Sequence, residues 1–116
     1  PITFEWAMER IDRCESIIWQ QVEQLAALDT DVVLEIAMST RELRDKQYQR
    51  ALALEIPYQM YYVDVSREIR RERVLERNRS KDEAFSFEVS LEMFDFVESM
   101  FEAPVGDELG EAIVLD

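Results

Sequence analysis

Histidine is absent from this 116-residue sequence, and cysteine occurs once, at Cys14. Without histidine the chain cannot form the Ser-His or Cys-His pairs that activate many nucleophiles, and it lacks the commonest zinc ligand. A single cysteine excludes an internal disulfide and a thiolate metal site, and it is typical of a reducing compartment. We therefore predict a cytoplasmic protein that uses neither of these chemistries.

Glycine is nearly absent as well. The two glycines are Gly106 and Gly110, in a stretch near the C-terminus that reads as a loop. A phosphate-binding loop needs glycines so that backbone N–H groups can approach the phosphates closely, and no segment of this sequence supplies one. Either the protein handles no nucleotide, or the phosphate-binding loop is a part that is absent from this sequence.

Long apolar runs and positive charge are also scarce. No apolar run approaches the roughly 18–20 residues that a bilayer span needs. The 26 acidic residues outnumber the 13 basic ones and give a net charge of −13. Such a surface repels phosphate backbones and anionic membranes at long range. We expect neither a nucleic acid nor a membrane as a partner.

What is present indicates one globular α/β domain over residues 1–116. Helices and strands alternate along the chain, which predicts right-handed crossovers, a parallel sheet and a three-layer arrangement with about three strands. An edge of so narrow a sheet would be bare, which predicts a homodimer through that edge. The expected helices span residues 4–28, about 40–56, 67–79 and 91–101, and the expected strands span residues 31–37, 58–65 and 112–115.

The most informative segment is the arginine-rich stretch 67–81, which holds seven of the 13 basic residues. At about 100° per residue of helix, Arg70, Arg73 and Arg77 share one face. Clustered guanidinium groups suit bidentate contacts with phosphate or carboxylate. Three interpretations stay open: a solvated helix with i,i+3 ion pairs, a phosphate-binding face, and a surface for a partner protein.

Three residues outside this helix also carry candidate roles. Glu35, at the end of the first predicted strand, could bind Mg²⁺ directly or through water, or could reach solvent or an arginine. Arg41 lies in the first turn of a predicted helix, where a cation opposes the macrodipole. Arg41 therefore binds an anion, pairs with Glu35, or is an ordinary surface arginine. Asp64 is expected to anchor Arg67 or Arg70.

These patterns resemble a family of bacterial P-loop kinase-like ATPases of the AAA_33 type, which is related to zeta toxins and chloramphenicol phosphotransferase. The resemblance covers nearly the whole chain and is most specific in the arginine helix and in the Phe-Ser-Phe-Glu segment that begins at Phe85. The segments that carry it are residues 31–35, 39–45, 62–78, 85–96 and 101–104.

The resemblance implies a P-loop NTPase-type parallel sheet, and transfer of the γ-phosphoryl group of ATP, bound with Mg²⁺, to an unknown acceptor. Members of the family begin with a strand, a Walker A loop and a helix, and none of these is found here. We therefore expect an incomplete sheet and an inactive fragment that binds no cofactor tightly. The alternative, from a different class, is a non-catalytic α/β module for protein interaction or regulation.

The resemblance also implies roles for particular residues. Arg73 and Arg77 match the Arg-x-x-x-Arg of the family's lid helix, where the arginines contact nucleotide phosphates and stabilise the charge of the transferring phosphoryl group. Arg70 is a weaker match for a phosphate contact. Arg41 would lie near the phosphoryl acceptor. Glu35 stands where the family usually has an aspartate, and it would bind Mg²⁺ through water. The lid-like segment would span residues 67–92.

Overall fold

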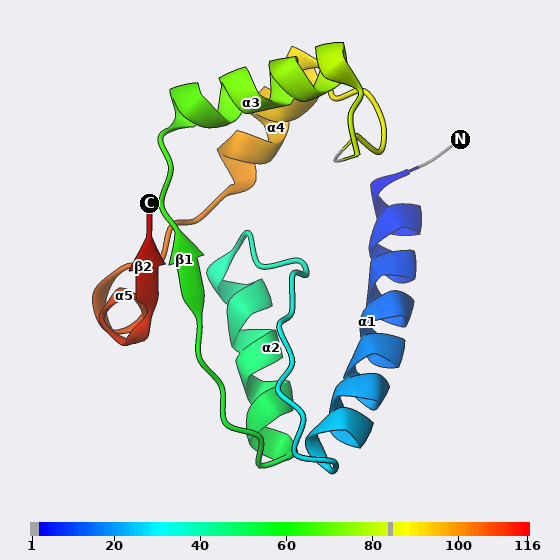
Figure 1. Cartoon of the computed structure of the whole chain (residues 1–116), viewed down its shortest axis with the longest axis vertical. Coiled ribbons are helices and arrows are strands. Elements are labelled where there is room, and N and C mark those ends of the chain that lie inside the picture. The colour runs from blue at the N-terminus through cyan, green and yellow to red at the C-terminus, as the bar shows by residue number, and fades with distance from the viewer. Residues whose placement is uncertain (1–2, 84) are drawn as a thin grey trace. The chain divides into compact units, whose positions relative to one another are not determined.

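The computed structural model describes residues 3–83 and 85–116, in which five helices and two short strands form (Figure 1). Within this described part, the chain divides into two compact units. The first unit runs to Met38 and resumes over Glu42–Tyr58, and the second comprises Ser39–Arg41 and Gln59–Asp116. The elements are α1 (Phe4–Ala26), α2 (Arg41–Ala53), β1 (Tyr61–Val63), α3 (Arg67–Ser80), α4 (Leu91–Met100), α5 (Gly106–Glu111) and β2 (Ile113–Leu115).

The predicted three-layer sheet of P-loop NTPase type is wrong. In the described residues the sheet has two strands, β1 and β2, which are parallel with Tyr61 opposite Ile113 and Val63 opposite Leu115. The expected strand at residues 31–37 is an extended connection instead, because no described segment forms backbone hydrogen bonds with it. A β-branched composition favours a strand, but a ladder needs a neighbour that supplies the other half of each hydrogen bond.

Helix α1 begins where predicted. The Oγ1 atom of its N-cap, Thr3, accepts a hydrogen bond from the Trp6 backbone N–H at 3.1 Å, which satisfies one of the free donors of the first turn. The helix ends at Ala26. A turn follows in which Asp29 has a φ of 54° and the Thr30 N–H donates to the Leu25 carbonyl at 3.0 Å. This positive φ closes the turn in the manner of a left-handed C-terminal cap.

The core of the first unit is small. Trp19 and Val22 of α1 pack against Ala51 of α2. Partly buried side chains surround these three, among them Leu34 from the connection and Ile56 after α2. Glu15, Trp19 and Val22 are the buried residues of α1, so its buried face carries a carboxylate and an indole beside an aliphatic side chain.

In the second unit, α3 and α4 begin at the predicted residues, 67 and 91. The Ser66 and Ser90 hydroxyls accept hydrogen bonds from the backbone N–H groups of Ile69 and Met93. The buried apolar side chains here include Val65 and Phe94. The stretch that contains the two glycines was predicted to be a loop. It forms the six-residue helix α5 instead.

Among the described residues, none of the helices has the length and apolar character needed to cross a membrane. The cytoplasmic location and the single domain over residues 1–116 stay predictions.

Candidate functional site

Helix α3 is fixed to α4 through Arg70, one of the predicted phosphate ligands. Its Nε and Nη2 atoms donate to the two carboxylate oxygens of Glu98 at 2.9 and 2.6 Å. Its Nη1 atom donates to the Val65 carbonyl at 2.5 Å. A two-pronged arginine–carboxylate contact holds the guanidinium plane in one orientation. In this arrangement Arg70 positions the helix, and its phosphate contact stays a prediction.

A second arginine of α3 also contacts α4, through one carboxylate oxygen. Arg67 forms an ion pair with Asp95, and its guanidinium carbon lies 5.5 Å from the centroid of the Phe94 ring. The expectation that Asp64 anchors Arg67 or Arg70 is therefore wrong. The anchoring carboxylates belong to α4, 28 residues further along the chain, and only tertiary packing brings them to α3.

Arg73 and Arg77 differ from these anchored arginines. Both side chains are exposed, and within residues 3–83 and 85–116 neither makes an ion pair or a side-chain hydrogen bond. The next arginine, Arg79, pairs with Glu76 one turn earlier, as the i,i+3 interpretation predicted. These two exposed guanidinium groups lie at positions that share a face of the helix. Arg71, which is half-buried, also makes no ion pair or side-chain hydrogen bond within the described residues, but it lies on a different face.

The two other predicted site residues, Arg41 and Glu35, belong to different units. Arg41 belongs to the second unit, where its Nε atom lies 3.8 Å from the Glu108 carboxylate. Glu35 belongs to the first unit and is exposed. No cluster of three or more acidic or cysteine side chains that could hold a metal occurs in the part of the chain that the structure describes. The roles of Arg41 at an acceptor and of Glu35 at Mg²⁺ stay predictions.

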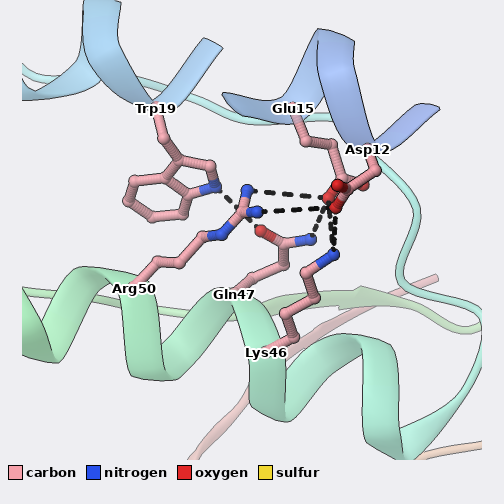
Figure 2. A network of polar contacts seen from close by, with 6 residues as sticks. All are labelled: Asp12, Glu15, Trp19, Lys46, Gln47 and Arg50. Atoms are coloured by element: carbon pink, nitrogen blue, oxygen red, sulfur yellow. Dashed lines mark hydrogen bonds and ion pairs between the residues drawn. The ribbon is translucent and has the colours of Figure 1, made fainter. Parts of the chain in front are cut away.

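The first unit contains a buried polar network that the sequence analysis missed (Figure 2). The Trp19 indole N–H donates to the Gln47 side-chain oxygen at 2.8 Å, and the Gln47 amide donates to the Glu15 carboxylate at 3.0 Å. Gln47 is fully buried, and Glu15 is 3% exposed. The available signal was the i, i+4, i+7 spacing of Glu15, Trp19 and Val22, which places a carboxylate on the buried face of α1.

Two cations of α2 balance the charge around this network. The Lys46 ammonium lies 2.9 Å from the Asp12 carboxylate and 3.8 Å from that of Glu15. The Arg50 guanidinium lies 3.9 and 3.7 Å from the same two carboxylates. Two acids thus face two bases, as the dashed lines of Figure 2 show. This pairing allows the Glu15 carboxylate to be buried, because an unpaired charge there would be costly.

The Asp12 carboxylate makes the stability of the first unit depend on pH. The hydrogen bond and the charge of Lys46, and then the charge of Arg50, lower the pKa of Asp12 below its usual value. A lowered pKa stabilises the fold above the unfolded-state pKa of about 3.9, and this contribution is lost as the pH falls through the folded pKa. We expect Asp12→Asn to be less stable than wild type at pH 6, with the difference shrinking below about pH 4.

Urea titrations of wild type and Asp12→Asn at several pH values would measure this difference. Glu5→Gln, at an exposed acid in the first turn of α1, is the control for loss of a negative charge on the same helix. A stability difference for Asp12→Asn that does not change with pH would contradict the role of the Lys46 contact.

No family model, curated protein or solved structure matches this chain.

Proposed function

We propose that this protein takes part in ATP-dependent phosphoryl transfer, and that Arg73 and Arg77 on α3 bind the nucleotide phosphates. One observation carries the proposal: these two arginines are exposed and unpaired within the described residues, whereas Arg67 and Arg70 on the same helix are paired with α4.

The charge balance of the chain supports this interpretation. The sequence has twice as many acidic as basic residues, so an exposed arginine has many carboxylates with which it could pair. Two unpaired guanidinium groups on one helix face suit an oxyanion with several acceptor atoms, and a polyphosphate offers these at the required spacing. The anchoring of Arg70 by Glu98 supports the proposal further, since it fixes the helix that presents these groups.

The position of α3 in the second unit is also favourable. The helix follows β1 after three residues, and β1 and β2 are parallel. The carboxyl ends of parallel strands lie at one edge of a sheet, where ligands of α/β proteins commonly bind. With two glycines in the sequence, the loop that cradles the phosphates would come from polypeptide outside these 116 residues. We therefore expect the chain alone to bind nucleotide weakly and to turn over little ATP.

The test is a titration with ATP–Mg²⁺ and, separately, with inorganic tripolyphosphate, followed through the NMR signals of the arginine Nε–H groups. Hydrogen bonds to charged groups contribute about 1.5–3 kcal/mol each. The double variant Arg73→Ala with Arg77→Ala is therefore expected to weaken binding at least about tenfold.

The matched control is Arg71→Ala with Arg79→Ala. It removes the same charge from the same helix, but neither arginine shares the face of Arg73 and Arg77, and Arg79 is paired with Glu76. We expect this control to bind tripolyphosphate within about twofold of wild type, because screened charges on an exposed helix act weakly at a distance. Equal weakening in the two double variants would show that net charge alone attracts the anion and would contradict the proposal.

A non-catalytic interaction module is the second candidate, and a specific observation favours it. Large apolar side chains are unusually exposed, including Val33 at 96%, Leu28 at 75% and Val105 at 66%. Extensive apolar surface commonly marks a region that another protein covers. If neither ATP–Mg²⁺ nor tripolyphosphate shifts any arginine signal, this second function is preferred.

A further inference from the structure

The first unit has an open groove of about 570 Å³ beside α1. One wall is α1 itself, and the other is the end of the extended connection that leads to α2. Most of the side chains that line the groove are apolar, which indicates an apolar occupant. They include Trp6, Ile11, Cys14 and Ile18 from α1, and Ile36 and Ala37 from the connection.

The connection, residues 31–37, has the properties of a β-strand that lacks a paired neighbouring strand. Residues 31–37 are extended in Figure 1, where they run in cyan from the end of α1 toward α2. Leu34 packs on the core while Val33 is 96% exposed, as in a strand whose successive side chains point to opposite faces. Within the described residues, none of their backbone N–H or C=O groups forms a backbone hydrogen bond. A row of free donors and acceptors beside an apolar groove is a template for strand pairing.

We propose that this groove binds an extended apolar strand of a polypeptide outside residues 1–116. The strand would form backbone hydrogen bonds with residues 33–37 and would lay alternate side chains against α1. A small apolar molecule could fill the groove, but it could not satisfy a row of alternating donors and acceptors. A polypeptide strand can both fill the groove and satisfy these groups, because its own backbone carries N–H donors and C=O acceptors at the same spacing.

Three charged side chains border the groove: Arg10, Glu15 and Glu35. Arg10 pairs with Glu9, and the charge of Glu15 is balanced by Lys46 and Arg50. The exposed Glu35 is therefore the groove's unbalanced charge among the described residues. The Oε1 atom of Glu15 is buried with no hydrogen-bond donor there. Together with the net charge of −13, Glu35 favours a strand with basic flanking residues and no acidic residue in its apolar part.

The probe for the test is an acetylated peptide of alternating valine and threonine with a lysine at each end. At saturating peptide, hydrogen exchange of the amides of residues 33–37 is expected to slow at least about tenfold. Alkylation of Cys14, the only cysteine, is expected to slow in parallel, because this exposed thiol lines the groove. The control peptides have the same sequence but are N-methylated at every second residue, in either register, and the one that lacks donors toward the groove is expected to give no protection.

A pair of variants separates the groove from the rest of α1. Cys14→Arg places a long side chain in the groove and is expected to weaken peptide binding about tenfold or more, as measured by hydrogen exchange. Ser16→Arg adds the same charge to an exposed position of α1 that does not line the groove, and it is expected to bind like wild type.

Three outcomes would overturn the proposal. Equal protection by both N-methylated peptides would mean that the groove takes apolar groups without strand pairing. Protection of residues 33–37 that appears without peptide and rises with protein concentration would assign the groove to a second copy of this chain. No protection at about 1 mM peptide, a concentration that would detect even a weak complex, would leave the groove without a strand partner.

Discussion

Replacing Gln47 by alanine is expected to lower the free energy of unfolding of the first unit by about 3 kcal/mol. The side chain is fully buried, and it links the Trp19 indole N–H to the Glu15 carboxylate. Without it, a buried donor and a buried carboxylate oxygen each lose a partner, and each loss costs about 1–3 kcal/mol. The core of this unit has few buried apolar side chains, so the loss is large relative to the total stability of the unit.

Urea unfolding followed by tryptophan fluorescence would measure this effect, because Trp19 lies within the network. Gln49→Ala is the matched control, since Gln49 lies on α2 and is exposed; we expect it to stay within about 0.5 kcal/mol of wild type. Gln47→Leu, which keeps most of the volume, should still lose about 2 kcal/mol if the hydrogen bonds dominate. Wild-type stability in Gln47→Leu would show that the side chain acts by packing alone.

The second large effect is expected for Phe94→Ala, which should destabilise the second unit by about 3–5 kcal/mol. Phe94 is the buried residue of α4, with 7% of its surface exposed. Its ring lies beneath the Arg67 guanidinium, which pairs with Asp95. Removing the ring leaves a cavity and also removes the apolar surface on which Arg67 rests, so α3 and α4 should loosen together.

Phe96→Ala provides the matched control on the same helix, since Phe96 is 59% exposed. Hydrogen exchange of the α3 and α4 amides would show the difference, with faster exchange throughout both helices in Phe94→Ala and little change in Phe96→Ala. Similar exchange rates in the two variants would indicate that Phe94 does not hold these helices together.

The parts of this protein that depend on local interactions could be predicted from the amino-acid sequence alone. The caps Thr3, Ser66 and Ser90 were predictable because each side chain bonds to a backbone N–H three residues later. The starts of α1, α3 and α4 followed from these caps. The shared face of Arg73 and Arg77 depends on helical periodicity alone. The two strands that form were also expected, and they pair in parallel as predicted.

Which of these groups form contacts depends instead on tertiary packing. Residues 31–37 have a strand-like composition, but a strand requires hydrogen bonds from a second segment, and none forms in the described residues. The arginines of α3 look equivalent in sequence, yet Arg70 is held by Glu98 of α4, while Arg73 and Arg77 stay unpaired within the described part. The contact between Glu15 and Gln47 depends on how α1 and α2 pack, across 32 residues of chain. Such contacts are set by the relative placement of whole elements, which local periodicity does not encode.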